Sequence, residues 1–195
     1  MVKKETNMKP VWIVLIVIGV IVLMLGGWLI GGLNRVVLLD ENVTASWSQV
    51  ENQLQRRNDL IPNLVNTVKG YASHEKGLFT EITRLRSQWA NATTRADKIA
   101  ASGGLGGALS KLLLVAENYP QLQASQNFLS LQAQIEGTEN RIAVERNRYN
   151  RAVQAFNSYK RTIAGGIFAS LRGLAAPAEY FEVEAAAKAV PKVEF

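Results

Sequence analysis

The chain has 195 residues, with 22 lysines and arginines against 16 aspartates and glutamates, so its formal net charge is +6. It contains no cysteine and one histidine, His74, which excludes disulfides, thiolate nucleophiles and the usual zinc sites. The length allows one globular domain plus an anchor, and the positive charge would suit anionic lipid or nucleic acid.

An uncharged stretch begins at Pro10 and ends at Asn34, and within it residues 11–30, VWIVLIVIGVIVLMLGGWLI, are almost entirely apolar. A run of about 20 apolar residues crosses the hydrocarbon core of a bilayer, so this segment is predicted to be a transmembrane helix. Trp12 and Trp28 would lie roughly 24 Å apart, one at each interface. A cleaved signal peptide is the alternative, but the apolar run is too long and no Ala-x-Ala-like site follows it.

The charges on either side of the span predict its orientation. Lys3, Lys4 and Lys9 precede it, whereas Arg35 alone follows closely, with two acidic residues nearby. The positive-inside rule therefore predicts that residues 1–10 are cytoplasmic and that the bulk of the chain is outside the cytoplasm. The expected location is the bacterial inner membrane, as a single-pass protein whose first partner is the lipid bilayer.

Four glycines close the span: Gly26, Gly27, Gly31 and Gly32. Gly27 and Gly31 have the small-xxx-small spacing that lets two membrane helices approach closely, which would permit a homo-oligomer. The favoured interpretation is that these glycines bend the chain between the anchor and the following domain.

The next segment alternates apolar spacings of three and four residues, which predicts a second long amphipathic helix. Its apolar stripe consists of Val43, Trp47, Val50, Leu54, Ile61, Leu64, Val68 and Tyr71. Arg57 occupies one position of this stripe, and Pro62 predicts a kink or short break because it removes an amide donor. Gly70 is expected to end the helix and Ser73 to cap the next, so that the chain reverses near residues 70–74.

A third helix is predicted over residues 75–94, with Glu75 in its first turn. Its apolar stripe is Leu78, Ile82, Leu85, Trp89 and Ala92. Ser102–Gly107, SGGLGG, lacks the preceding strand and the following Gly-Lys-Ser/Thr of a phosphate-binding loop, so it is interpreted as a flexible connector. Residues 108–117 read as a shorter helix that ends before Pro120.

The longest amphipathic helix is predicted over residues 126–161. Its stripe consists of Phe128, Leu131, Ile135, Thr138, Ile142, Tyr149, Ala152, Phe156 and Tyr159. It would reach about 54 Å, so partner helices must run alongside it. In an antiparallel arrangement Arg57 lies level with about residue 141, which predicts an ion pair with Glu139, or else with Glu145, that fixes register. The alternative is that Pro62 turns Arg57 into water.

The C-terminal part begins with an apolar segment, residues 163–176, that contains one charge. If the long helix returns toward the anchor, this segment could rest on the bilayer; packing beneath the helices is the alternative. The last ten or so residues have no periodic pattern and are expected to fray.

Several strings resemble the LemA family. They are RRNDLIPNLV at 56–65, VKGYASHE at 68–75, AENYPQL at 116–122, EGTENRI at 136–142 and RYN at 148–150. The resemblance covers most of residues 34–182; the stretch 102–107 lies outside the family pattern. It implies an antiparallel up-and-down four-helix bundle on a membrane anchor, with no established activity and no catalytic residue to carry over. Family members often occur beside membrane peptidases or small membrane proteins, which suggests partners of that kind.

The predicted organisation is therefore all-α, with a short cytoplasmic N-terminus at 1–10, a transmembrane helix at 11–30, a helical bundle with coiled-coil-like packing at 34–165, and a membrane-proximal segment and tail at 166–195. The titratable candidates for catalysis are His74, Glu75, Glu81, Glu136, Glu139 and Glu145. They form no acid–base constellation, so no catalytic, cofactor-binding or metal residue is predicted.

Nucleic-acid binding is not predicted, because the arginines of the longest helix point in several directions around it. These are Arg141, Arg146, Arg148, Arg151 and Arg161. The leading hypothesis is a scaffold or interaction module at the membrane surface, for an unidentified membrane or envelope protein. The alternatives are a small-ligand or envelope-state sensor that uses Arg57, Glu139 and Glu145 in the bundle core, and an accessory subunit of a membrane peptidase.

Overall fold

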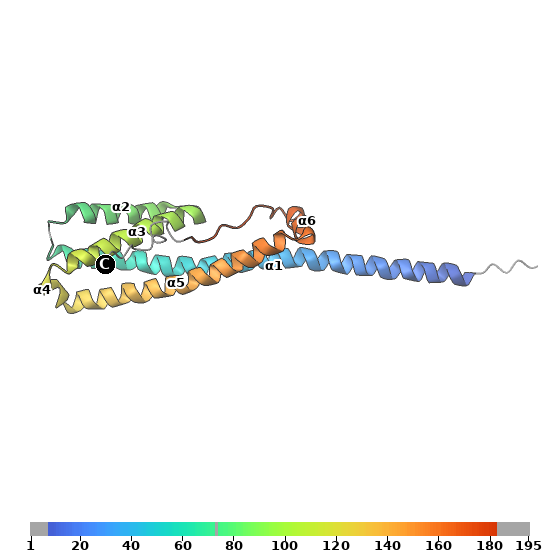
Figure 1. Ribbon diagram of the computed structural model, residues 1–195, viewed down its shortest axis with the longest axis horizontal. Helices are drawn as coiled ribbons and strands as arrows, with labels where there is room; N and C mark the ends of the chain where they lie inside the picture. Colours follow the sequence, from blue (N-terminus) through green and yellow to red (C-terminus); the bar gives the residue numbers. More distant parts are fainter. Residues whose placement is uncertain (1–7, 73, 183–195) are drawn as a thin grey trace, which may run out of the picture. The chain divides into compact units, whose positions relative to one another are not determined.

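The computed structural model describes residues 8–72 and 74–182, and within these ranges the chain forms helices and no β-strand. The helices are α1 (Met8–Lys69), α2 (Lys76–Asn91), α3 (Arg95–Ala116), α4 (Pro120–Gln123), α5 (Gln126–Lys160) and α6 (Ile163–Leu171) (Figure 1). The all-α prediction, with a long apolar helix at the N-terminus, is confirmed.

The chain divides into two compact units. The first, here called the apolar unit, combines the described part of residues 1–42 with residues 154–178. The second, the core unit, combines residues 43–153 with the described part of residues 179–195. Helices α1 and α5 each contribute residues to both units.

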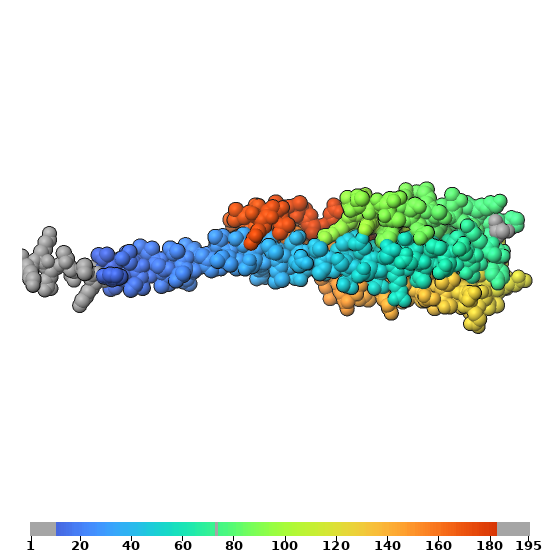
Figure 2. All heavy atoms as spheres, turned by 180° about the vertical axis from the view of Figure 1, so that it is seen from behind, coloured from blue at the N-terminus to red at the C-terminus, as the bar shows by residue number. Residues whose placement is uncertain are grey.

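The apolar unit exposes large hydrophobic side chains along α1. Leu23 is 77% exposed and Trp12 is 62% exposed, and the side chains of residues 11–25 have no other part of the unit beside them (Figure 2). This stretch of α1 is long and apolar enough to cross a membrane. Among the described helices α3 passes the same test of length and composition, but a third of its apolar window is buried, as in the core helix of a soluble domain.

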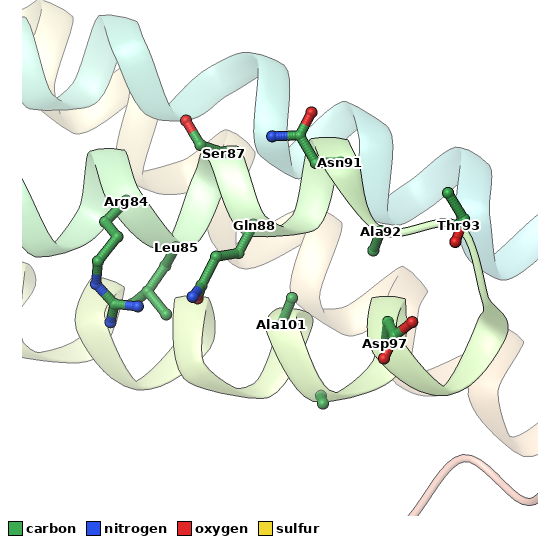
Figure 3. A pocket seen from close by; sticks show the side chains of 10 residues that line it. Arg84, Leu85, Ser87, Gln88, Asn91, Ala92, Thr93, Asp97 and Ala101 are labelled. Carbon is green, nitrogen blue, oxygen red and sulfur yellow. The ribbon is translucent and has the colours of Figure 1, made fainter.

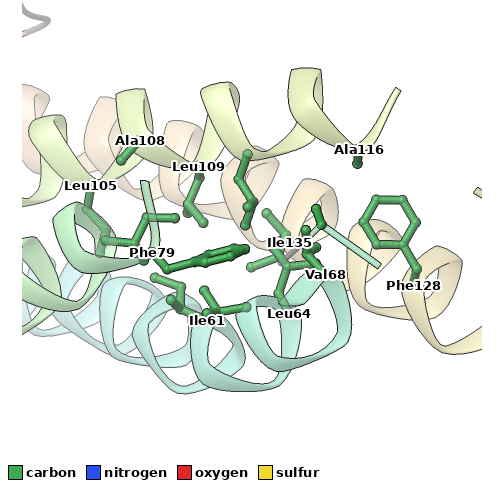
Figure 4. Close-up of a cluster of buried hydrophobic side chains, with 14 of the residues drawn as sticks. Ile61, Leu64, Val68, Phe79, Leu105, Ala108, Leu109, Ala116, Phe128 and Ile135 are labelled. Carbon is green, nitrogen blue, oxygen red and sulfur yellow. The ribbon is translucent and has the colours of Figure 1, made fainter. Parts of the chain in front are cut away.

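The core unit buries one hydrophobic cluster. It draws Ile61, Leu64 and Val68 from α1, Phe79 and Ile82 from α2, Leu105, Leu109 and Leu112 from α3, Leu122 from α4, and Phe128 and Ile135 from α5 (Figure 4). Helices α2 and α3 pack against each other along this cluster (Figure 1). Burial of these side chains is the main stabilising contribution, because each fully buried aliphatic or aromatic side chain contributes roughly 1.5–3 kcal/mol.

The predicted apolar stripes are largely confirmed, and two of the departures lie at element ends. Tyr71 lies beyond the end of α1 and is 43% exposed, whereas Ala72 next to it is 0% exposed. In α2 the residue that enters the core is Phe79, 4% exposed, and its neighbour Leu78 is only partly buried. In both cases the periodicity is right and the phase is displaced by one residue near a turn.

The short break predicted at Pro62 is wrong, and the four glycines of the span do not interrupt α1 either. The helix passes through the four glycines near residue 30 without a break, and Gly32 lies against the ring of Phe168 from α6. The helix also continues through Pro62. A proline inside a helix costs about 3 kcal/mol, but its neighbours Ile61 and Leu64 are both buried, and their packing in the core holds the helix together.

The predicted flexible connector at Ser102–Gly107 is also wrong, because these residues lie in the interior of α3. The helix starts at Arg95, since Thr94 caps it by accepting a hydrogen bond from the Asp97 amide at 3.1 Å. Thr94 was predicted as the end of the preceding helix, which ends at Asn91 instead. The glycines are tolerated because leucines on the same helix, such as Leu105 and Leu109, are buried.

The turn between α1 and α2 contains Ser73, which the structure does not describe, so the predicted capping role of Ser73 lies outside the described residues. The predicted fraying of the last ten residues also lies outside them. Helix α2 begins at Lys76, and Glu75 occupies its N-cap position without a side-chain hydrogen bond to the helix.

Candidate functional site

The core unit contains a buried arginine. Arg57 of α1 is 3% exposed, and its guanidinium contacts both α3 and α5. Nη1 donates to Glu139 Oε1 at 2.8 Å, and Nη2 donates to the backbone oxygen and to Oγ of Ser102, both at 3.0 Å. Because a buried guanidinium is costly unless it is paired and hydrogen-bonded, these contacts make the position tenable.

The small residues of α3 make room for the Arg57 side chain. Ser102 and Gly106 are one turn apart on α3, and a Cβ built on Gly106 would lie 3.7 Å from Arg57 Nη1. A larger side chain at either position would fill the space that the guanidinium occupies. The glycine-rich stretch of α3 therefore receives the arginine of α1, a role that its composition alone did not indicate.

Of the two carboxylates predicted to pair with Arg57, Glu139 does so and Glu145 does not. Glu145 accepts from Arg148 Nη1 at 2.7 Å, three residues further along α5. The Glu139 side chain is 42% exposed, so solvent screens the ion pair from one side. The alternative, in which Pro62 turns Arg57 into water, is wrong.

A second polar cluster of the core unit surrounds Tyr149 of α5, which is 0% exposed and stacks edge-on against Trp47 at 5.4 Å. Its hydroxyl donates to the backbone oxygen of Glu179 at 2.7 Å. Burial raises the pKa of Tyr149, and the nearby Arg95 guanidinium opposes this rise.

The side chain of the neighbouring Asn150 binds the backbone of the same C-terminal segment. Asn150 Nδ2 donates to the backbone oxygen of Phe181 at 3.0 Å, and Asn150 Oδ1 accepts from the backbone nitrogen of Phe181 at 2.8 Å. Phe181 is 7% exposed, and the Arg146 guanidinium lies over its ring. Residues 179–181 therefore belong to the packed part of the core unit.

The surface of the core unit has open grooves. One groove, of about 860 Å³, lies between α2 and α3 (Figure 3). It is lined by small or polar side chains together with Leu85, and its charged residues are Arg84 and Asp97. A smaller groove of about 510 Å³ runs between α3 and α5 beside Gly106 and Glu139. Both are open surface features.

The structure does not bring the sequence-predicted catalytic candidates together. His74 is exposed in the turn between α1 and α2, Glu136 of α5 accepts from Gln132 of its own helix, and Glu81 lies half-buried on α2. Within the described residues, no group of three or more histidines, cysteines, aspartates or glutamates is placed to hold a metal ion. Of the arginines on α5, only Arg146 has an aromatic partner among the described residues.

Two sets of polar contacts in the core unit were not predicted from the sequence. Ser102 was hidden in a stretch interpreted as a connector, although a serine one turn before a glycine in a helix was a usable signal of close approach. Asn150 lies within the family-like string RYN, and because a side-chain amide beside the buried Tyr149 has to find hydrogen-bond partners, that position could have indicated its contacts.

Comparison with known proteins matches residues 46–195 to the model of the LemA family. The chain is also similar to the magnetosome proteins MamQ 2 and MamQ 1 of Paramagnetospirillum magneticum, each 26% identical over 150 residues, or 64% of this chain and 55% of the relative. The magnetosome protein MamQ of Magnetospirillum gryphiswaldense is 25% identical over the same shares. The chain thus spans about half the length of the curated relatives it matches.

Proposed function

Because the chain belongs to the LemA family, we propose that it is a membrane-anchored helical scaffold, without enzymatic activity, that holds a membrane or envelope protein at a defined place on the membrane surface. The observation that carries this proposal is the contrast within one chain between the exposed apolar stretch of α1 and the open grooves of the core unit.

The anchor is assigned to residues 11–30, because exposed apolar side chains on all sides of a helix are stable in lipid and costly in water. Three lysines before the span support an orientation with the N-terminus in the cytoplasm and the core unit outside it. A reporter such as alkaline phosphatase fused after Phe195 is then active. An inactive fusion, with a cytoplasmic reporter active at the same place, reverses the orientation.

The core unit is proposed to be an antiparallel four-helix bundle of α1, α2, α3 and α5. Two contacts support opposite directions for α1 and α5: Trp47 meets Tyr149, and ten residues further along α1, Arg57 meets Glu139, ten residues earlier in α5. Helices α2 and α3 are joined by a short connection, residues 92–94, which supports opposite directions for these two helices as well. Such a bundle offers a rigid surface to a partner, with specificity set by the exposed side chains.

The proposal that the protein lacks enzymatic activity rests on the ion pairs that its carboxylates form. Those of Glu139, Glu145 and Glu51 are engaged with Arg57, Arg148 and Lys98 respectively, so none of them is held ready as a general base in an enclosed pocket. The relatives' names give the magnetosome as their setting.

The test is photo-crosslinking in intact membranes. A photoreactive residue placed at Ser87 or Gln88, which line the groove between α2 and α3, is expected to give a discrete adduct with a membrane or envelope protein such as a membrane peptidase. The exposed Gln134 of α5 is the matched control and is expected to give none. Lack of a discrete adduct at every exposed position of the core unit would contradict a scaffold.

A second candidate function, a small-ligand sensor, is favoured by the groove beside Glu139, because a ligand there would compete with Arg57 for the carboxylate. A thermal-shift screen of envelope metabolites tests it: a stabilising ligand whose effect is lost in Glu139→Gln supports a sensor. A screen without such a ligand, together with a groove-specific adduct, supports the scaffold.

A further inference from the structure

Helix α6 has one face that is buried in the apolar unit and an opposite face that is exposed. Gly165, Phe168 and Ala169 are buried, whereas Ile163, Ile167 and Leu171 are 89%, 54% and 65% exposed. The exposed residues follow one another at intervals of four, so they form one stripe on the side of α6 opposite its buried residues. A short helix in water has no reason to hold three large aliphatic side chains on its free face.

The buried face of α6 is seated on α1 at the end of the apolar stretch. The Phe168 ring meets the Trp28 ring edge-on at 4.9 Å, and a Cβ on Gly32 would lie only 2.0 Å from Phe168 Cε2. Helix α6 runs across α1 and not along it (Figure 1). Thr162 fixes the start of α6 by accepting from the Gly165 amide at 3.0 Å.

These contacts set the level of α6 relative to the membrane. Trp28 lies near the C-terminal end of the predicted span, where tryptophan favours the boundary between acyl chains and headgroups. The free stripe of α6 points away from α1 at that same level. Arg161 and Arg172 are exposed at the two ends of the helix, where basic side chains can reach anionic headgroups.

We infer that α6 is a second membrane contact, an interfacial helix whose Ile163, Ile167 and Leu171 side chains enter the acyl-chain boundary beside α1. The inference rests on the proposed membrane anchor and extends it: the chain touches the bilayer twice, through residues 11–30 and through α6. Two contacts restrict the tilt and rotation of the anchor, which a single span leaves free.

The test uses the full-length protein in nanodiscs of phosphatidylcholine and phosphatidylglycerol. Because the native chain has no cysteine, single variants Ile167→Cys, Leu23→Cys and Ser158→Cys can each carry a nitroxide label without background. Collision with oxygen, which concentrates in lipid, is compared with collision with a water-soluble nickel complex. Leu23 reports the proposed span, and Ser158 of α5 is the exposed control in the same unit.

The expected result is a several-fold higher ratio of oxygen to nickel accessibility at position 167 than at position 158, approaching the ratio at position 23. A water-like ratio at 167 with a lipid-like ratio at 23 overturns the inference and leaves the anchor standing. A label at 167 shielded from both reagents indicates a protein partner on this face and also overturns it. A water-like ratio at 23 contradicts the anchor itself.

Discussion

Leu23 of α1 and Leu112 of α3 are the same residue type in two helices that are both apolar and long enough to cross a membrane, yet Leu23 is 77% exposed and Leu112 is 0% exposed. The difference lies in what surrounds each helix. Around α3 the protein supplies apolar neighbours from α1, α2 and α5. Around residues 11–25 of α1 it supplies none within the apolar unit, so that stretch needs another apolar medium. A hydropathy threshold selects both helices, and burial separates the one that is packed in the core from the one that is not.

The two units also differ in how they use small residues. In the apolar unit Gly32 lets the Phe168 ring of α6 approach α1. In the core unit Ser102 and Gly106 let a charged side chain approach α3. The same local property, a missing or short side chain, thus serves an apolar contact in one unit and a polar contact in the other.

Truncation of the two leucines gives the largest expected contrast. Leu112→Ala is expected to destabilise the core unit by about 2–5 kcal/mol, because it removes buried methyl groups and leaves a cavity. Leu23→Ala is expected to leave the same unfolding transition within about 0.5 kcal/mol of the native chain. Chemical denaturation of the full-length protein in nanodiscs measures both. Equal losses in the two variants would mean that residues 11–30 support the core and do not simply anchor it.

The Arg57–Glu139 pair gives the next largest effect. A double-mutant cycle between Arg57→Met and Glu139→Gln is expected to show a coupling of about 1–3 kcal/mol, since both variants remove the same hydrogen-bonded pair. Glu145→Gln is the matched control, because Glu145 pairs with Arg148, and its coupling to Arg57→Met should stay below about 0.5 kcal/mol. Coupling to Glu145 and none to Glu139 would refute the arrangement described for the core unit.

Removal of the Tyr149 hydroxyl gives a smaller effect that depends on pH. Tyr149→Phe is expected to cost about 0.5–1.5 kcal/mol at neutral pH, because the hydrogen bond to Glu179 is lost. Burial raises the pKa of Tyr149 above its ordinary 10.0, so the folded state favours the neutral phenol. Its contribution is therefore complete below pH 10.0 and is lost as the pH rises through the raised value.

Denaturation of the native chain and Tyr149→Phe from neutral to alkaline pH checks this sign. The advantage of the native chain over the variant should shrink above pH 10.0. An advantage that grows with alkaline pH would show that the phenolate is the favoured form, contrary to the observed burial.

The smallest expected effect separates two glycines of α3. Nothing lies within 4 Å of a Cβ built on Gly107, so Gly107→Ala should stabilise the core unit by about 0.5–1 kcal/mol through helix propensity alone. A Cβ on Gly104 would meet Leu85 Cδ2 at 3.1 Å, and Gly104→Ala should gain less. Thermal unfolding compares the pair. A larger gain at Gly104 would show that the contact between α2 and α3 is looser than described.

The sequence was informative where periodicity is long and uninterrupted. Stripe residues such as Leu54, Ile135 and Phe156 are buried as predicted, and Arg57 pairs with Glu139 as predicted from the separation of the two helices along the chain. The pairing was accessible because a charge inside an apolar stripe requires a partner and only a few carboxylates were within reach.

What the sequence could not supply were properties that depend on neighbours distant in the chain. Glycine and proline lower local helix propensity, so Pro62 and Ser102–Gly107 were predicted to interrupt helices that tertiary packing in fact maintains. The side chain of Asn150 hydrogen-bonds the backbone of Phe181, 31 residues further along the chain, and no periodic pattern in the sequence predicts such a contact.

The central proposal, that residues 11–30 lie in lipid and the core unit lies in water outside the cytoplasm, is tested most directly by cysteine accessibility in intact cells. Gln88→Cys, on the exposed surface of α2, is expected to react with a membrane-impermeant maleimide before lysis, and Leu23→Cys is expected to remain unreactive until detergent is added. Reaction of Leu23→Cys in intact cells, or reaction of Gln88→Cys only after lysis, would contradict the account.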